Sequence, residues 1–513
     1  MSAYTEFSSY IAEVNDLLNA ISILNWDART QMPLGGTETR GKQLATLSAL
    51  VQERLISERL QDLLDRTEGE VACLPPDSME RRSVAAVREA SDLFRRTPPE
   101  LTRELAHLRS VAGKTWAEAR ASNDFAHFAP DLERMFALNR EFARVIGYKE
   151  HPYDAMLALY EPGMTAARLQ TLFAVLRERV VPLLREIVDS GRKPRTDFLK
   201  LHYPPERQKQ FALEVARSFG FDLSRGRLDE SLHPFEISFT RNDVRITTRY
   251  NPHFLPTALF GVLHEAGHAI YEQNVAPELT RSALTSDLKG LYAVGGVSFG
   301  AHESQSRLWE NLVGRSRTFW QHWLPRLQVY FPEQLADIDV ETFYRAVNTV
   351  EPSLIRVEAD EVTYNLHIML RVEIEMGLMD GSMAVRDLPA IWSQKMQDYL
   401  GVTPPDDTQG VLQDIHWSHS NIGSFPCYTV GNIMASQLYE AAGQQIEGLE
   451  NSLAEGNYAP LREWLTQHVY RYGRTFSPDE LLVKATGRLL DTEPYLNYLE
   501  SKFRELYALR GGA

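Results

Sequence analysis

The residues of this sequence best able to do chemistry form the pattern His264-Glu265-Ala266-Gly267-His268. Histidines four positions apart lie on the same face of a helix, so both imidazoles can reach one metal ion. Glu265 is turned about 100° away and can hold a water molecule instead. Zinc bound in this way activates water and polarises a carbonyl group, and a carboxylate beside it accepts the proton of the water. The pattern therefore predicts metal-assisted hydrolysis of an amide bond.

A chance origin of this motif is improbable. With 14 histidines in 513 residues, roughly 0.03 matches to the pattern are expected by accident. The segment Leu255–Val275 also carries an apolar face with helical spacing, and Pro256 suits the first turn of a helix. We therefore expect a helix that presents His264 and His268 on one face.

The motif leaves the third protein ligand of a catalytic metal open. Glu272 continues the spacing of four but lies about 12 Å along the helix from His264, too far to share an ion. Glu278 follows the predicted helix. Glu303 is favoured because it opens the next predicted amphipathic helix, Glu303–Trp323, while His302 is a rival ligand by its chemistry.

Helical periodicity dominates the rest of the chain. An apolar stripe at steps of three and four begins it, formed by Phe7, Tyr10, Ile11, Val14, Leu17, Leu18, Ile21 and Leu24. Similar stripes cover residues 80–118, 165–190, 205–219, 302–323, 355–379, 430–450 and 459–511. Ser477, Pro478 and Glu480 together predict a helix start with a capping box. The alternating segment 243–250 predicts a strand, and hence one small sheet just ahead of the motif.

The composition narrows the class of protein. Lys and Arg number 54 against 69 Asp and Glu, a formal charge of −15, which disfavours nucleic acid as a partner. Cys73 and Cys427 are too few for a disulfide framework. Glu6 and Glu13 interrupt the N-terminal stretch where a signal peptide needs apolar residues, and no apolar run is long enough for a transmembrane helix. We expect a soluble cytoplasmic protein with no membrane contact.

Motifs spread over nearly the whole chain resemble the Taq-type thermostable carboxypeptidases, a family of metallopeptidases. Besides the His-Glu-x-x-His pattern, they comprise Asn25-Trp26-Asp27 with Met32-Pro33, His151-Pro152-Tyr153-Asp154, Tyr160–Thr165, His233-Pro234-Phe235, Asp243-x-Arg245-x-Thr247, the run His302–Asn311, the run Ile355–Glu361, Gln413–Trp417 and Ala485-Thr486-Gly487.

The resemblance implies a mostly α fold: a single domain over residues 1–513 with a deep substrate channel and one small β-sheet near the active site. Two helical lobes flanking a central cleft are one form that such a domain takes. It also implies one Zn²⁺ per chain, with Co²⁺ acceptable, and a homodimer. The implied activity releases single amino acids from the free C-terminus of peptides, with broad specificity and weak action on proline.

The resemblance also implies roles for individual residues. It maps the glutamate ligand onto Glu303, beside His264 and His268, and leaves Glu265 as general base. An enzyme acting at the C-terminus must hold a carboxylate, which a guanidinium fork does well. The match makes Arg356 that clamp. A structural ion pair with Glu358, Asp360 or Glu361 is the alternative.

Further residues are expected to line the site. Tyr428 is the candidate hydroxyl that supports the oxyanion of the tetrahedral intermediate, although a buried tyrosine often has an ordinary structural partner. Arg245 and His233 are expected to line the channel or support the strand. His416 is expected to contact substrate or to pack beside Trp417.

One segment departs from the family pattern. Ser420 stands where the family has glycine, Ser424 where it has tyrosine and Cys427 where it has threonine. The metal motif and the base are intact, so activity is expected and the substrate range is in question.

Two other functions compete with this interpretation. An endo-acting oligopeptidase of the same architecture would share Glu265 and Glu303 but need no carboxylate clamp. An inactive metal-binding scaffold would have no use for the base Glu265.

Overall fold

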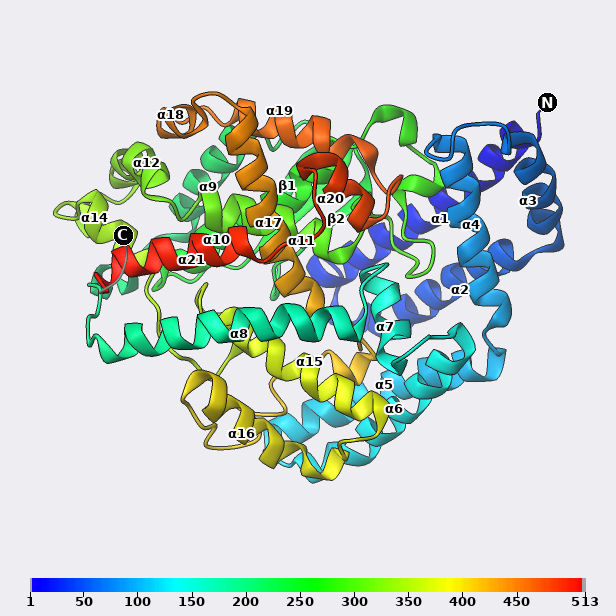
Figure 1. The fold of residues 1–513 in the computed structure, drawn as a ribbon, viewed down its shortest axis with the longest axis horizontal. Helices are drawn as coiled ribbons and strands as arrows, with labels where there is room; N and C mark the ends of the chain where they lie inside the picture. The colour runs from blue at the N-terminus through cyan, green and yellow to red at the C-terminus, as the bar shows by residue number, and fades with distance from the viewer. Residues whose placement is uncertain (1, 510–513) are drawn as a thin grey trace. The chain divides into compact units, whose positions relative to one another are not determined.

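The computed structural model describes residues 2–509, and the chain is mostly helical there. This part contains 21 α-helices and one three-stranded sheet. The predicted mostly α fold with one small sheet is therefore confirmed (Figure 1). The chain divides into two compact units. Unit 1 holds the chain up to Arg95 with Pro194–Val347 and Met434–Leu490, and unit 2 holds Arg96–Lys193, Asn348–Ile433 and the chain from Asp491 on. Between residues 2 and 509, no helix is long and apolar enough to cross a membrane.

Unit 1 contains both the predicted histidine motif and the sheet. Its helices are α1 Ala3–Thr30, α2 Thr37–Ile56, α3 Glu58–Val71, α4 Met79–Arg96, α9 Pro205–Phe219, α10 Leu255–Gln273, α11 Phe299–Arg307, α12 Arg317–Tyr330, α13 Pro332–Leu335, α14 Val340–Val347, α18 Leu449–Ala454, α19 Ala459–His468 and α20 Pro478–Thr486, with most of α17 Pro426–Gln445.

Unit 2 is helical and carries Arg356, His416 and Tyr428. Its helices are α5 Pro99–Ser122, α6 Phe125–Ile146, α7 Pro152–Tyr160, α8 Ala166–Asp189, α15 Tyr364–Asp380, α16 Leu388–Leu400 and α21 Glu493–Leu506, with the first residues of α17. Within it α5 packs along α6, and α15 packs against α7, α8 and α16 (Figure 1).

The predicted N-terminal stripe forms part of the core of unit 1. Helix α1 packs along α2 and α3, and its buried residues include Phe7, Ile11, Val14, Leu18 and Ile21. The two predicted stripe members Leu17 and Leu24 are only partly buried.

The sheet lies against the helix that carries the motif. Its strands are β1 Gly226–Glu230, β2 Glu236–Thr240 and β3 Asp243–Thr248. The order is β1-β3-β2, with β1 parallel and β2 antiparallel to β3. Helix α10 contacts β2 and β3. The prediction of one small sheet beside the motif is therefore confirmed.

Several predicted helical stretches are wrong in their bounds. The stretch 80–118 is divided into α4 and α5, and 430–450 is interrupted between α17 and α18. The stretch 302–323 begins earlier, at Phe299, passes through a π-helical segment, η5 Leu308–Val313, and resumes as α12. The stretch 355–379 begins with a short 3-10 turn, η6 Arg356–Glu358, and its helix starts only at Tyr364. There Asp360 accepts hydrogen bonds from the backbone N–H groups of Val362 and Thr363. The stretch 459–511 is divided into α19, α20 and α21, and its last two residues lie outside the described part.

The predicted capping box is confirmed. The Ser477 hydroxyl accepts the backbone N–H of Glu480, and the Glu480 carboxylate accepts the backbone N–H of Ser477. Pro478 occupies the first turn of α20.

Ser420, which replaces the family's glycine, adopts a backbone conformation that glycine favours. It follows the 3-10 turn η8 Trp417–His419 with φ 59° and ψ 27°, the left-handed region that costs an L-residue roughly 1 kcal/mol. Its Oγ donates to Asn139 Oδ1 at 3.0 Å and accepts from Asn139 Nδ2 at 2.9 Å. The buried Asn139 amide thus offsets the strain and fixes this turn to α6.

Two substitutions separate these effects. Ser420→Ala removes both hydrogen bonds and keeps the strain, so we expect it to lower the free energy of unfolding by about 1–2 kcal/mol. Ser420→Gly removes the same hydrogen bonds but relieves the strain, so it should be about 1 kcal/mol more stable than Ser420→Ala. Denaturant unfolding of the two variants measures the difference. Equal stability of the two would show that this backbone conformation is not strained.

Candidate active site

A close approach of two helices builds the centre of the site. At Gly267 of α10, an added Cβ would lie 2.5 Å from the backbone oxygen of Gln305 and 2.7 Å from Cα of Ser306. Both atoms belong to the backbone of α11, so no side-chain movement could make room. Glycine at this position therefore allows α11 to lie directly on the turn of α10 that separates the two histidines.

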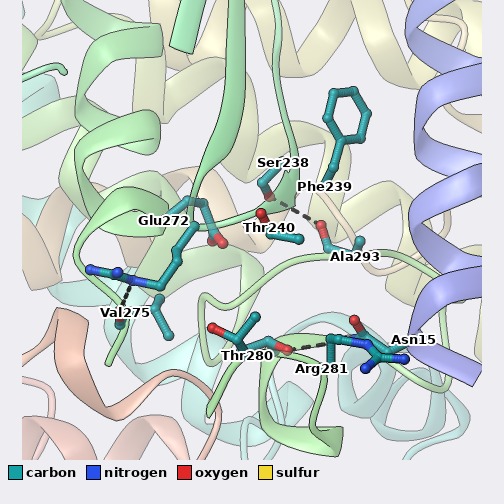
Figure 2. A pocket seen from close by; sticks show the side chains of 11 residues that line it. Asn15, Ser238, Phe239, Thr240, Glu272, Val275, Thr280, Arg281 and Ala293 are labelled. Carbon is teal, nitrogen blue, oxygen red and sulfur yellow. Dashed lines mark hydrogen bonds between the residues drawn. The ribbon is translucent and has the colours of Figure 1, made fainter. Parts of the chain in front are cut away.

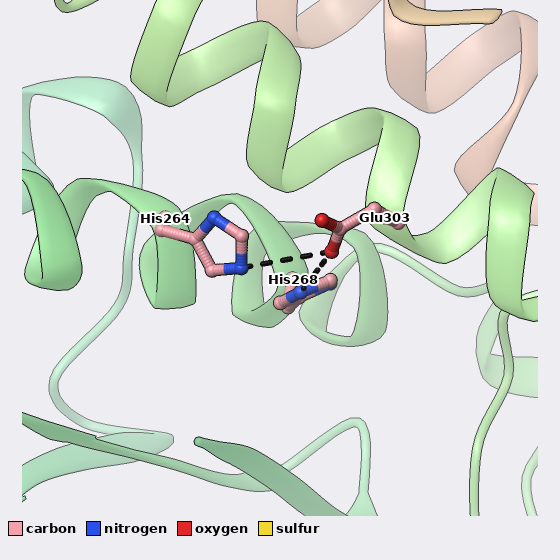
Figure 3. Close-up of side chains that lie close together, drawn as sticks. All are labelled: His264, His268 and Glu303. Atoms are coloured by element: carbon pink, nitrogen blue, oxygen red, sulfur yellow. Dashed lines mark ion pairs between the residues drawn. The ribbon is translucent and has the colours of Figure 1, made fainter. Parts of the chain in front are cut away.

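The helix contact brings His264, His268 and Glu303 together (Figure 3). Glu303 Oε2 lies 3.6 Å from His264 Nε2 and 3.4 Å from His268 Nε2. Two ligand atoms each about 2.1 Å from a tetrahedral ion are roughly 3.4 Å apart. Both distances match the spacing of ligands around a zinc-sized ion, and the three residues offer ligand atoms that all lie within 4.8 Å of one another.

Two of the three donors, His268 and Glu303, also have the protonation state that a metal requires. Burial, with the nearby His302, lowers the pKa of His268 to about 3, so its imidazole is neutral at pH 7 and has a free lone pair. Burial would raise the pKa of Glu303, but Arg307 and the two histidines hold it well below its usual range. Burial would lower the pKa of His264, but the carboxylates of Glu303 and Glu310 raise it above its usual value, so a metal would have to displace a proton from this imidazole. Two imidazoles and one carboxylate are a donor set typical of catalytic zinc. The residues therefore fit a divalent metal.

His302, the rival third ligand, is directed elsewhere. Its ring stacks on His268 with a centroid distance of 4.4 Å, and its Nε2 lies 3.0 Å from Glu272 Oε1. Of the described residues, only the trio with Glu303 forms a metal-sized group. Glu272 and Glu278 are not part of it.

Glu272 instead serves the structure around a small cavity (Figure 2). Its carboxylate accepts the backbone N–H groups of Gly295 and Gly296 at 2.9–3.0 Å. The cavity holds about 20 Å³, room for one water molecule, and polar side chains including Asn15 and Ser238 border it. Glu272, which is not a metal ligand, therefore anchors the loop that leads into α11.

His264 is held by a second carboxylate that the motif does not reveal. Its Nδ1 lies 3.0 Å from Glu310 Oε2, and Arg315 donates to the other oxygen of Glu310 at 3.0 Å. Burial would raise the pKa of Glu310, but the contacts with His264, Arg315 and Arg307 lower it to about 2. A carboxylate bonded to Nδ1 leaves Nε2 of His264 directed at Glu303.

Glu265 is buried and carries no hydrogen bond from any described residue. Burial raises the pKa of Glu265 to about 7. The guanidinium of Arg29 exerts the opposite effect and stacks on Phe235, 3.3 Å from the ring centroid. The carboxylate is thus available to a water molecule at a pKa suited to proton transfer.

Arg356 forms an ion pair, with a partner other than those expected. Its guanidinium binds Asp414 Oδ1, with Nε at 3.0 Å and Nη2 at 2.9 Å. Nη1 lies 3.3 Å from the Tyr364 hydroxyl. The alternative structural pairs with Glu358, Asp360 or Glu361 do not form.

His416 and Tyr428 lie together in unit 2, near Arg356. His416 Nε2 is 3.4 Å from the Tyr428 hydroxyl, and the His416 ring stacks on Phe425. The Arg356 guanidinium lies 5.4 Å from the centre of the Tyr428 ring. Burial lowers the pKa of His416 to about 4, so the imidazole is neutral at pH 7.

Arg245 and His233 stand apart from these groups. Arg245 pairs with Asp243 at 2.9 Å and stacks over Trp26 and Phe239, which favours its supporting role on β3. The His233 side chain is exposed, and its carbonyl accepts the Ser231 hydroxyl.

Two residues of these sites, Glu310 and Arg371, were not predicted from the sequence. Glu310 lies seven residues after Glu303, two helical turns along the same face, which was a usable signal. Arg371 is the one cation within the apolar run 366–372 and is fully buried. An isolated charge in such a run indicates a buried partner, here Asp414.

Comparison with known proteins identifies the family. The profile of the carboxypeptidase Taq (M32) metallopeptidases matches residues 6–503. The chain is 42% identical to thermostable carboxypeptidase 1 of Thermus thermophilus, over 99% of both chains, and 38% identical to carboxypeptidase 1 of Bacillus subtilis, over 98% of both. A crystal structure of the M32 carboxypeptidase from Deinococcus radiodurans superposes with a TM-score of 0.94 at 40% identity, covering 99% of each chain. The chain therefore belongs to the carboxypeptidase Taq (M32) family of metallopeptidases and is a metallocarboxypeptidase.

Proposed function

We propose that this metallocarboxypeptidase uses zinc to release single amino acids from the C-terminus of peptides. The observation that carries the proposal is the position of Glu303 Oε2, 3.6 and 3.4 Å from the Nε2 atoms of His264 and His268. Two imidazoles and one carboxylate suit zinc, and cobalt is an acceptable substitute. The named relatives, all carboxypeptidases, support the same activity.

His264, His268 and Glu303 would hold the metal. A zinc ion in such a site lowers the pKa of water and polarises the scissile carbonyl. Glu310 keeps His264 in the tautomer whose Nε2 lone pair faces the site. Arg307 donates to the other oxygen of Glu303 at 2.7 Å and so orients that carboxylate.

Glu265 is the proposed general base. Its unbonded carboxylate, with a pKa of about 7 caused by burial, can accept a proton from the attacking water near neutral pH. The resulting carboxylic acid can then donate that proton to the leaving amine. Burial excludes bulk water that would compete for the proton.

Arg356 is the proposed ligand of the substrate's terminal carboxylate. A guanidinium has five N–H groups, and the contacts with Asp414 and Tyr364 use three of them. One N–H on each terminal nitrogen is left for a carboxylate. An enzyme that requires this contact removes residues from the end of the chain, whereas an endopeptidase does not.

The remaining assignments are secondary. We propose that the Tyr428 hydroxyl, with His416 beside it, supports the oxyanion of the tetrahedral intermediate. Arg245 is assigned to the support of β3, and the exposed His233 to the channel wall. Broad specificity, weak action on proline, a single domain and a homodimer are carried over from the resemblance. A cytoplasmic location is proposed from the small number of cysteines and the interrupted N-terminal stretch.

Metal removal tests the proposed ligands. A chelator should abolish activity, and added zinc or cobalt should restore it. Glu303→Gln should lower zinc affinity by at least 10-fold because it loses an anionic ligand, measured by competition with a chromophoric chelator. Glu278→Gln, at an exposed glutamate of the turn Pro277–Leu279, is the matched control and should bind zinc normally. A zinc affinity of the Glu303→Gln protein equal to that of the native protein would exclude Glu303 as a ligand.

The base is tested by Glu265→Gln. The amide preserves size but accepts no proton, so kcat should fall by roughly 10²–10⁴-fold while zinc content is unchanged. Peptide hydrolysis and metal content are measured on the same sample. The exposed Glu447 provides a matched control, Glu447→Gln, with normal kcat. A zinc-loaded Glu265→Gln enzyme of normal rate would place the base elsewhere.

The exopeptidase mode is tested with matched peptides that end in a free acid or an amide. Loss of a charge-assisted bidentate contact costs about 2–4 kcal/mol, or roughly 30- to 1000-fold in kcat/KM. The native enzyme should therefore prefer the acid by that factor, and Arg356→Ala should remove the preference. Arg386→Ala, at an exposed arginine of the same unit, should keep it. A mass-spectrometric time course with internal fragments formed equally from both peptides would instead indicate the endo-acting oligopeptidase.

A further inference from the structure

Asp414 is shared by two buried arginines. Its Oδ1 binds Arg356 at 2.9–3.0 Å, and its Oδ2 accepts from Arg371 Nε at 2.6 Å. Gln413 joins the same group: its Oε1 accepts from Arg371 Nη2 at 2.7 Å and from the backbone N–H of Arg356 at 3.0 Å. One carboxylate thus serves two guanidinium groups.

The two arginines differ in what they can reach. Arg371 is 0% exposed, and its three nitrogens donate to Asp414, to Gln413 and to the backbone oxygen of His367. It stacks over Trp392. Arg371 therefore cannot touch a peptide, whereas Arg356 is 6% exposed and retains N–H groups without a protein partner among the described residues.

The charges of the cluster do not cancel. The two arginines hold the pKa of Asp414 well below its usual range despite burial. Burial lowers the pKa of Arg371 only to about 10, so it is charged at pH 7, and His416 is neutral. Glu375, one turn beyond Arg371, has its oxygens bound to Tyr153, Trp417 and the backbone of Gly423. Burial raises the pKa of Glu375 to about 7, so this carboxyl is only partly ionised at pH 7. The two positive charges of Arg356 and Arg371 therefore outweigh the negative charge of Asp414 and the partial charge of Glu375.

We propose that Arg371 is a positioning residue that supplies the counter-charge of Asp414, so that Arg356 keeps a net positive charge for the terminal carboxylate of a peptide. The inference rests on the proposed role of Arg356. With Arg356 and Asp414 alone, the pair would be neutral, and repulsion by Asp414 would offset much of the attraction between Arg356 and an incoming carboxylate. With Arg371 present, Asp414 orients Arg356 without neutralising the site.

A purely structural role for Arg371 gives different expectations. In that case its three hydrogen bonds would matter, because they tie Asp414 and Gln413 to α15, and its charge would not. Neutral hydrogen-bonding groups can make such contacts without the penalty of burying a second guanidinium. Variants that separate charge from hydrogen bonding decide between the two roles.

The experiment measures kcat/KM for matched acid and amide peptides in the zinc-loaded enzyme. Arg371→Gln makes the cluster neutral and should lower the acid-over-amide preference roughly 10- to 50-fold. Arg371→Lys keeps the positive charge but loses the planar guanidinium with its several N–H donors. It should retain most of the preference for acid over amide peptides. The double variant Arg371→Gln with Asp414→Asn restores one net positive charge and should recover the preference lost in Arg371→Gln. Rescue by removal of a second bonding partner is expected only for a charge effect.

The outcomes separate this inference from the proposal it rests on. If Arg371→Gln and Arg371→Lys lose the preference equally, or the double variant does not recover it, the charge role is wrong. If Arg356→Ala loses the preference while Arg371→Gln keeps it, only this inference fails. If Arg356→Ala keeps it, the proposed clamp fails as well. Should Arg371→Gln not fold, Asp414→Asn is compared with the double variant: the preference must be greater in the single variant, and equality would overturn the inference.

Discussion

The structure of the metal site in unit 1 depends on the contact of α10 with α11 at Gly267. The backbone of α11 occupies the space in which any side chain at position 267 would lie. This approach sets Glu303 over the gap between His264 and His268, and it places η5 where Glu310 reaches His264. The contacts within the site therefore follow from the absence of one Cβ atom.

Much of this arrangement could be predicted from local sequence. The helix of the motif, the strand 243–248 and the start of α20 rest on signals that act over a few residues: periodicity, β-branched alternation and capping. Each is confirmed. The choice of Glu303 over His302 could not be made locally, because both stand next to each other on the chain and only the packing of α11 on α10 directs one of them to the histidines.

The helix bounds predicted from apolar spacing were wrong where tertiary contacts determine the local structure. Nothing in Leu308–Val313 marks a π-helical segment, since neither Pro nor Gly interrupts it. Arg356 was placed in a helix because apolar spacing continues from it. The helix starts only at Tyr364, after a turn in which the Asp360 side chain accepts the backbone N–H groups of Val362 and Thr363. The shared use of Asp414 by Arg356 and Arg371 joins segments more than forty residues apart, and no spacing rule predicts such a meeting.

The burial of the Arg356–Asp414–Arg371 cluster has a consequence for behaviour in salt. Charges at the surface are screened over about 10 Å at 0.1 M ionic strength, whereas buried charges are screened far less. The net charge of −15 repels an anionic peptide terminus at long range, and added salt weakens that repulsion. The attraction inside the cluster would persist. Raising ionic strength would therefore speed the encounter with free-acid peptides while leaving their discrimination from blocked peptides in place.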